Sequence, residues 1–236
     1  MRTGPVIAAA LLLLLPLSAA RAAEPPPLSL PARLADTGGG TQLITAEAPD
    51  PGATAGTVTW WERRGDRRWV KAGSAPARFG AGGLVAGERR RQGTSTTPAG
   101  LYDLRFGFGI EAPPPGTAYP YRRVTRDAWW CQDNASASYN RWVRPLPADC
   151  RAEEAEHLIT YGKQYAYGVV IGFNYERPVR GRGAGIFLHV NGDGPTAGCV
   201  SVPKDAMARI LTWLRAGARP HIAIGTASGS TAITRY

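Results

Sequence analysis

Residues 186–201 read IFLHVNGDGPTAGCVS. An apolar run typical of a strand ends at His189, and a second apolar run begins at Cys199. The loop between them contains Gly192, Gly194 and Pro195, which favour tight turns. We therefore expect a strand, a turn and a returning strand, an arrangement that would place the imidazole of His189 beside the thiol of Cys199.

Short apolar runs separated by glycine and proline continue outward from this stretch, and they predict a mainly β protein. The fold class expected is a β-sandwich or a barrel-like domain. Two helices are expected to flank it. One covers residues 151–161, with three glutamates early, and the other begins at Pro203 and stops at Gly217. The strands are expected at 42–46, 57–61, 69–72, 101–104, 119–124, 165–173, 185–190, 199–202 and 221–224.

The N-terminal region has the pattern of an exported protein. Arg2 precedes an apolar run at residues 6–17, and Ala20-Arg21-Ala22 fits a signal peptidase site, so residues 1–22 are interpreted as a signal peptide. The run is too short to span a bilayer, and no transmembrane segment is expected. Residues 23–40 are predicted to form a flexible lead-in rich in proline and glycine, and residues 41–236 a single catalytic domain.

The charge of the chain is strongly positive, with 28 lysines and arginines against 18 acidic residues, a net +10. Two arginine clusters stand out, at residues 63–68 and at residues 89–91. An exported cationic protein is held at anionic cell-wall polymers or at the outer membrane leaflet, although a single cluster is more often a solvated turn. Export argues against a nucleic-acid partner. We expect a secreted, extracytoplasmic or cell-wall-associated bacterial protein.

The three cysteines fall into two groups. Cys131 and Cys150 flank a polar, turn-prone loop, and a disulfide between them would stabilise it by about 3 kcal/mol. Cys199 is then unpaired. A free thiol in an oxidising compartment is either an inert buried side chain or a chemical group, and its glycine-flanked loop favours the second.

A thiol needs a base to become a nucleophile, and His189 is the candidate. The backbone N–H groups of Ala197, Gly198 and Cys199 could hold the oxyanion of a tetrahedral intermediate, so the pattern indicates acyl transfer through a thioester. His157, in the predicted helix, and His221, at a strand start, are interpreted as structural. The histidines lack ligand spacing, so neither a metal nor a cofactor is expected.

These residues resemble the L,D-transpeptidase catalytic domain of the YkuD type, in a secreted bacterial subgroup. The resemblance rests on His189 after an apolar run, on Thr196-Ala197-Gly198-Cys199, and on the upstream block Thr97-Pro98-Ala99-Gly100. It covers roughly residues 41–225. A further set, a tryptophan, an aspartate and a Tyr-Asn pair seen in that subgroup, corresponds to Trp130, Asp133, Tyr139 and Asn140.

The resemblance implies a specific reaction. Cys199 would attack the carbonyl of the third residue of a peptidoglycan stem peptide and expel the terminal D-alanine, and an amine of a neighbouring stem would resolve the acyl-enzyme. His189 would be the base, and the backbone of Gly198 and Cys199 would stabilise the oxyanion, with no cofactor. The residues considered for substrate binding are Thr196, Asn174, Asp133 and Tyr139.

The chain departs from the family pattern in four respects. Ala197 replaces a histidine, which is tolerable because the group used there is a backbone amide. Ser201 occupies the position of an arginine, so the sequence does not show which residue recognises a substrate carboxylate. The segment 93–96 lacks the acidic residue often found there, and the spacing from His189 to Cys199 is shorter than in many members.

Two other functions remain open. The same site could hydrolyse its acyl-enzyme and act as an L,D-carboxypeptidase. Alternatively, the chain could be a non-catalytic cationic wall-binding protein that keeps the fold. A papain-like hydrolase is disfavoured, because there the cysteine precedes the histidine and starts a helix.

Overall fold

The structure is a computed structural model that describes residues 1, 4, 30–65 and 67–227. Apart from Met1 and Gly4, the predicted signal peptide lies outside the described residues, as do positions 23–29 of the predicted lead-in. The described structure begins at the 3-10 helix η1, Leu30–Arg33, upstream of the point where the sequence predicts order to start. Leu30 packs against a small apolar cluster that includes Leu43.

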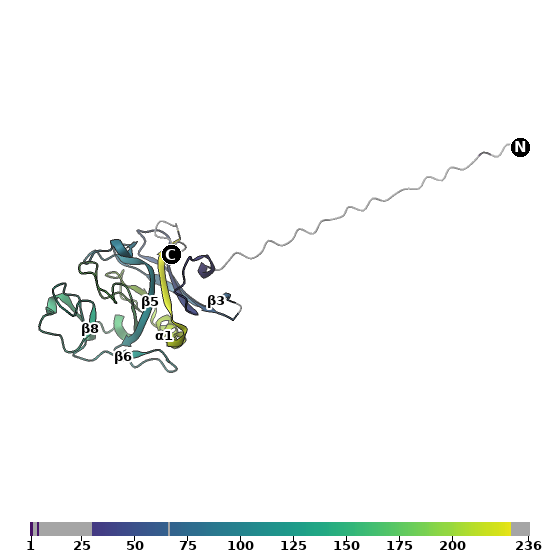
Figure 1. The fold of residues 1–236 in the computed structure, drawn as a ribbon. Helices are drawn as coiled ribbons and strands as arrows, with labels where there is room; N and C mark the ends of the chain where they lie inside the picture. Colours follow the sequence, from purple (N-terminus) through teal and green to yellow (C-terminus); the bar gives the residue numbers. More distant parts are fainter. Residues whose placement is uncertain (2–3, 5–29, 66, 228–236) are drawn as a thin grey trace.

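A ten-stranded sheet forms the body of the molecule, with the order β10-β11-β12-β3-β2-β1-β13-β5-β4 and with β6 paired to β5. Because β10 pairs with both β11 and β5, the sheet closes on itself like a barrel (Figure 1). Each strand predicted from the sequence overlaps a strand of this sheet. Its members are β1 Gln42–Ala48, β2 Ala55–Arg63, β3 Trp69–Arg78, β4 Leu84–Ala86, β5 Thr97–Gly109, β6 Tyr121–Arg123, β10 Gly168–Ile171, β11 Phe187–Val190, β12 Val200–Val202 and β13 His221–Thr226.

β1 shows why these segments are strands. Ile44, Ala46 and Ala48 alternate along it and enter the main core, whereas Leu43 points to the other side, under η1. Successive side chains of a strand point to opposite faces, so both faces of β1 are covered and six of its seven residues are buried.

A second, three-stranded sheet has the order β8-β7-β9 and comprises β7 Trp129–Cys131, β8 Arg141–Val143 and β9 Ala155–His157. It corrects the helix predicted at residues 151–161, which is wrong. In its place, β9 pairs with β7 so that His157 faces Trp129, and the two rings stack at 4.1 Å. The remaining short turns are the 3-10 helices η2 Gly87–Arg89, η3 Ala152–Glu154, η4 Leu158–Thr160, η5 Gln164–Ala166 and η6 Ala216–Ala218.

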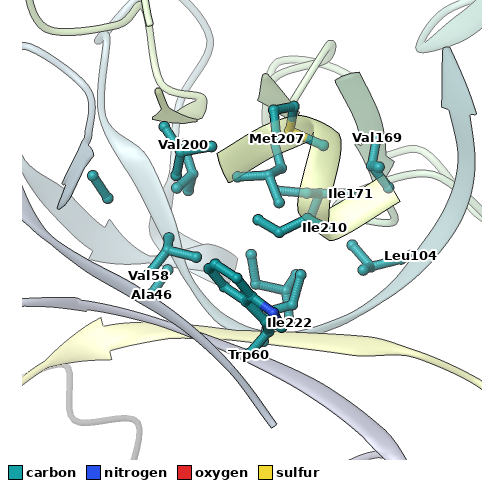
Figure 2. Close-up of a cluster of buried hydrophobic side chains, with 14 of the residues drawn as sticks. Ala46, Val58, Trp60, Leu104, Val169, Ile171, Val200, Met207, Ile210 and Ile222 are labelled. Carbon is teal, nitrogen blue, oxygen red and sulfur yellow. The ribbon is translucent and has the colours of Figure 1, made fainter. Parts of the chain in front are cut away.

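The one α-helix of the described residues is α1, Lys204–Trp213. Its apolar stripe, including Met207 and Ile210, packs in the same core as Trp60 and Ile222 (Figure 2). It ends before Gly217, the predicted stop, because Gln42 binds the backbone at its end. The side chain of Gln42 donates to the carbonyl of Trp213 at 2.6 Å and accepts from the N–H of Arg215 at 2.9 Å.

The mainly β, barrel-like prediction is therefore confirmed, whereas the two flanking helices reduce to one. No helix in the part of the chain described by the structure is both long and apolar enough to cross a membrane.

Candidate active site

His189 lies on β11, and Cys199 directly precedes β12, which runs parallel to β11 and does not form a hairpin with it. His189 of β11 is opposite Ser201 of β12. The predicted strand return is therefore wrong in direction. The connection detours to the end of β3, where Thr196 donates its N–H to the carbonyl of Phe79 at 2.8 Å and its carbonyl accepts from Ala81 at 2.9 Å.

This detour still brings the two side chains to one place. Cys199 precedes Ser201 by two positions, and residues two apart along an extended chain share a face. Cys199 and His189 accordingly line the same cavity, of about 500 Å³. The cavity is large enough for a peptide segment.

The imidazole of His189 is held in one orientation. The residue is only 6% exposed, and its Nδ1 lies 2.8 Å from the carbonyl oxygen of Val190. A carbonyl can only accept, so Nδ1 carries the proton and Nε2 keeps a free lone pair. Burial lowers the pKa of His189 to about 4, and the imidazole is neutral near pH 7. The group that orients the base, which the sequence did not identify, is thus a backbone carbonyl.

The thiol of Cys199 is free, 7% exposed and not yet ionised. Its Sγ donates to the carbonyl of Gly185 and accepts the N–H of Phe187, both at 3.3 Å. Burial raises the pKa of Cys199 to about 12, and the nearby Glu156 adds to that rise. Among the described residues, no hydrogen bond joins Sγ to His189. The resting pair is therefore a thiol and a neutral imidazole, and the S–H must turn from Gly185 toward His189 before the proton can move.

The loop before Cys199 offers backbone donors. Gly198, at φ +129, donates its N–H to Thr196 Oγ1 at 3.1 Å, and that hydroxyl donates to the carbonyl of Cys199 at 2.7 Å. The N–H of Gly198, expected to hold an oxyanion, is thus already engaged. Within the described hydrogen bonds, the N–H groups of Ala197 and Cys199 have no acceptor. Thr196 lines the cavity and shapes the loop.

The Tyr-Asn pair supports the cavity wall from behind. Asn140 Oδ1 accepts from Trp130 Nε1 at 2.9 Å and from the N–H of Gly185 at 3.0 Å, which fixes the residue whose carbonyl receives the thiol proton. The hydroxyl of Tyr139 accepts from the N–H of Gly183 at 3.0 Å. Tyr139 is not among the residues that line the cavity. Both side chains therefore position the strand entry before β11.

Asn174 also lies outside the cavity lining. Its side chain bridges a loop, donating to the carbonyl of Gly183 at 2.8 Å and accepting from the N–H of Val179 at 2.7 Å. These contacts hold the segment that leads to Gly185. In this structure Asn174 shapes the site from a distance.

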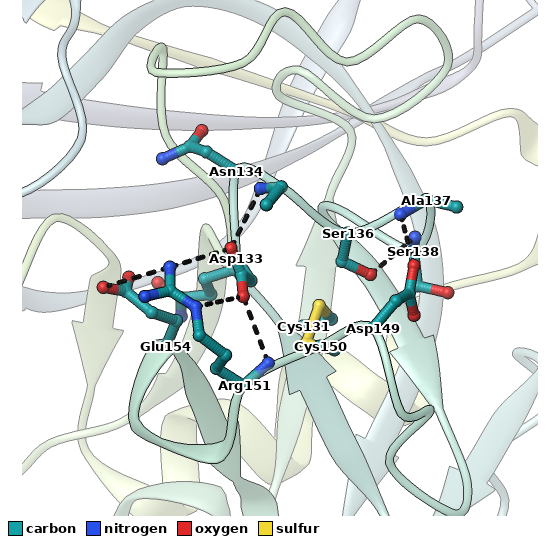
Figure 3. A network of polar contacts seen from close by, with 12 residues as sticks. Cys131, Asp133, Asn134, Ser136, Ala137, Ser138, Asp149, Cys150, Arg151 and Glu154 are labelled. Atoms are coloured by element: carbon teal, nitrogen blue, oxygen red, sulfur yellow. Dashed lines mark hydrogen bonds and ion pairs between the residues drawn. A yellow bond between two sulfur atoms is a disulfide. The ribbon is translucent and has the colours of Figure 1, made fainter.

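Asp133 is buried beside the predicted disulfide, away from the cavity lining (Figure 3). Cys131 and Cys150 are bonded at 1.96 Å, which confirms the predicted pairing. The carboxylate of Asp133 accepts from Arg151 Nε at 2.7 Å and from the backbone of Ala135 at 2.9 Å. The bond with Arg151 holds the pKa of Asp133 well below its usual range. Asp133 therefore stabilises the loop.

Three charged residues line the cavity, Arg90, Glu156 and Asp193, and sequence reasoning predicted none of them as site residues. The carboxyl of Glu156 accepts from Gln132 Nε2 at 2.6 Å and from the hydroxyl of Tyr165 at 2.5 Å, and burial raises its pKa. The ring of Tyr165 meets His189 edge-on, with centroids 5.5 Å apart. Glu156 belongs to the helix that the sequence predicts at residues 151–161, and Arg90 to an arginine cluster that is expected to be a solvated turn. No local sequence signal separates them from their neighbours.

The other histidines lie elsewhere. His157 Nε2 is 2.7 Å from the carbonyl of Arg126, and His221 Nδ1 is 2.8 Å from that of Arg219. Neither lines the cavity of Cys199. Among the described residues, no group of three or more His, Cys, Asp or Glu side chains could hold a metal ion.

A free cysteine and a neutral imidazole that line one cavity, with unused backbone N–H groups next to the sulfur, are the parts of a cysteine-dependent acyl-transfer site. A model of the L,D-transpeptidase catalytic domain, YkuD, matches residues 53–222, a span that contains both residues. The chain belongs to this family, whose substrate is peptidoglycan. A comparison with curated protein sequences gives no match.

Proposed function

We propose that the protein is an exported bacterial L,D-transpeptidase that links peptidoglycan stem peptides through a thioester on Cys199. The observation that carries the proposal is the shared cavity of a free thiol and an imidazole whose Nε2 is available as a base. The family match supports the same chemistry.

Acylation begins when substrate displaces the S–H from Gly185. His189 Nε2 takes the proton, and Sγ attacks the carbonyl carbon of the third stem residue. The carbonyl oxygen becomes negative, and the N–H groups of Cys199 and Ala197 would stabilise it. When the intermediate collapses, the bond to D-alanine nitrogen breaks. The imidazolium returns its proton to that nitrogen, and free D-alanine leaves.

Deacylation repeats these steps with a different nucleophile. An amine of a second stem loses a proton to His189 and attacks the thioester carbon. The C–S bond then breaks, and the sulfur recovers the proton, which regenerates the thiol. If water replaces the amine, the product is a shortened monomer, and the protein is an L,D-carboxypeptidase.

The surface charge supports a location at the cell wall. The net charge is +10, and Arg64, Arg67 and Arg91 are exposed. Anionic wall polymers would concentrate such a protein near its substrate. With the N-terminal pattern of a signal peptide, this favours an extracytoplasmic enzyme that works at the wall.

Intact mass spectrometry tests the proposal. Wild type incubated with a tetrapeptide donor should gain the mass of the donor less D-alanine, and C199A should gain nothing. H189Q should be acylated far more slowly, whereas H221Q, a matched histidine outside the cavity, should behave as wild type. Adding an acceptor stem should give a cross-linked dimer. Absence of any wild-type adduct would favour the non-catalytic wall-binding protein, and a shortened monomer without dimer would favour the carboxypeptidase.

A further inference from the structure

Arg90 is a buried cation in the catalytic cavity. It follows the 3-10 helix η2, is 6% exposed and lines the cavity together with Cys199. Its neighbours in sequence, Arg89 and Arg91, are exposed. The arginine cluster is thus divided by the fold, with two charges in solvent and one turned inward.

The guanidinium of Arg90 is anchored at two of its three nitrogens. Nε donates to the carbonyl of Thr96 at 2.8 Å and Nη1 to that of Arg182 at 3.1 Å, while the ring of Phe173 lies 5.6 Å from Cζ. In the part of the chain that the structure describes, no group accepts a hydrogen bond from Nη2 and no carboxylate forms an ion pair with Arg90. Burial lowers its pKa. A buried charge without a counter-ion is costly, which makes an external anion its natural partner.

Two glycines leave the space that this guanidinium occupies. Gly183, at φ +114, would overlap Nη1 if it carried a Cβ, and a Cβ on Gly198 would lie 2.8 Å from Nη2. Gly198 directly precedes the nucleophile. The free end of Arg90 therefore lies beside the loop that would hold the oxyanion.

The position where the family pattern has an arginine carries no positive charge in this chain. Ser201 stands there, and its hydroxyl donates to Asn191 Oδ1 at 2.8 Å. Among the cavity-lining residues of the described chain, Arg90 is the one lysine or arginine.

We propose that Arg90 is the substrate-binding residue that recognises the terminal carboxylate of the acyl donor. The inference rests on the proposed function. In a donor that ends one residue beyond the scissile bond, the carboxylate is separated from the attacked carbonyl carbon only by the leaving nitrogen and one Cα. A cation beside Gly198 would therefore lie close to the carboxylate of a bound donor. Arg90 would thus select peptides with a free carboxyl directly after the scissile bond.

The test compares two donors, a tetrapeptide with a free C-terminal acid and the same peptide as its C-terminal amide. We expect wild type to be acylated about 10- to 100-fold faster by the acid, the usual range for a charge-assisted hydrogen bond to a buried group. R90Q should lose most of this preference by slowing with the acid alone. R91Q removes the same charge from an exposed neighbour and should retain the preference.

The ratio of the two rates is measured on one preparation, so it does not depend on how much of a variant is folded. R90K supplies a second variant, which keeps the charge without the forked geometry and should retain part of the preference. Equal slowing of both donors in R90Q, or a wild type without preference, would overturn the assignment to the carboxylate while acylation of Cys199 still stands. A wild type acylated by neither donor would remove the proposed function and this inference with it.

Discussion

At the scale of single residues, the catalytic pair is held uncharged by its surroundings. Burial disfavours the imidazolium of His189 and the thiolate of Cys199 alike, so neither ionises the other at rest. An uncharged pair costs less to bury than an ion pair. A thiol kept protonated is also protected from oxidation until substrate arrives, because the thiolate is the reactive form.

The depressed pKa of His189 predicts an acid-sensitive stability. The folded value is about 4, below the ordinary 6.5, so the unfolded chain binds the proton first as the pH falls. The stabilisation is therefore complete above pH 6.5 and is lost between 6.5 and about 4, by roughly 3 kcal/mol. Denaturant unfolding of wild type and H189Q at pH 7 and pH 4 should show the steeper loss in wild type. Equal losses would contradict the buried neutral imidazole.

Glu156 is expected to hold the thiol in its protonated form. Its carboxyl adds to the rise in the pKa of Cys199, so E156Q should lower that pKa from about 12. Each unit of decrease gives about ten times more thiolate at a fixed pH below the pKa. Iodoacetamide alkylation of Cys199 between pH 8 and 11 measures the shift. E153Q, which alters an exposed carboxylate on the preceding 3-10 helix, should leave the alkylation profile unchanged.

Part of this site could be predicted from residue types, and the rest could not. Cys199 and His189 were predicted because an unpaired cysteine and a histidine at a strand end are chemically conspicuous. Arg90 and Glu156 were not, because they are held by contacts with Arg182 and Gln132, which lie 92 and 24 positions away in the sequence. A local pattern of arginines or glutamates looks the same whether one of them turns inward or not.

At the scale of elements, the loop from β11 to β12 makes the site. It joins parallel strands over a short distance, which normally takes a longer crossover. It does so by attaching Thr196 to the end of β3. The sequence predicts the glycine-rich turn but not this attachment, since β3 lies far upstream. For the same reason the direction of β12 was predicted wrongly although its position was right.

The hydroxyl of Thr196 is expected to matter more for activity than for stability. T196V keeps the shape but removes the bonds from Gly198 and to Cys199. At about 1 kcal/mol for each bond, the rate of acylation should fall about 10- to 30-fold, with a melting temperature close to that of wild type. T212V, on the exposed face of α1, is the control. An unchanged acylation rate in T196V would show that the loop keeps its geometry without this hydroxyl.

The two sheets differ in how far the sequence revealed them. Nine of the ten strands of the large sheet were predicted, because most of their apolar runs are long or sharply bounded, whereas β4, with three residues, was not. The three strands of the small sheet have three residues each, which is too few for an alternation of apolar and polar residues to be recognised. The early glutamates of residues 151–161 favour a helix locally, but pairing of β9 with β7 prevails. Long-range pairing routinely overrides a local helix preference.

At the scale of the whole molecule, the small sheet and its disulfide support the catalytic wall of the barrel. Cys131 ends β7 and is bonded to Cys150 across a sequence separation of 19 residues. The loop that they close contains Asn140, which holds Gly185 in place beneath the thiol. Loss of the disulfide should therefore affect both the stability of the fold and the geometry of the site.

The variant C131S/C150S tests this coupling, since it leaves Cys199 as the sole cysteine. A loop of that size predicts a loss of about 3 kcal/mol in unfolding free energy, because the unfolded chain gains freedom. Under conditions where the variant remains folded, acylation should also slow, since Asn140 is no longer fixed. N140A with the disulfide intact separates the two effects. It should slow acylation similarly while keeping the contribution of the crosslink, and full activity in both variants would show that the small sheet does not position Gly185.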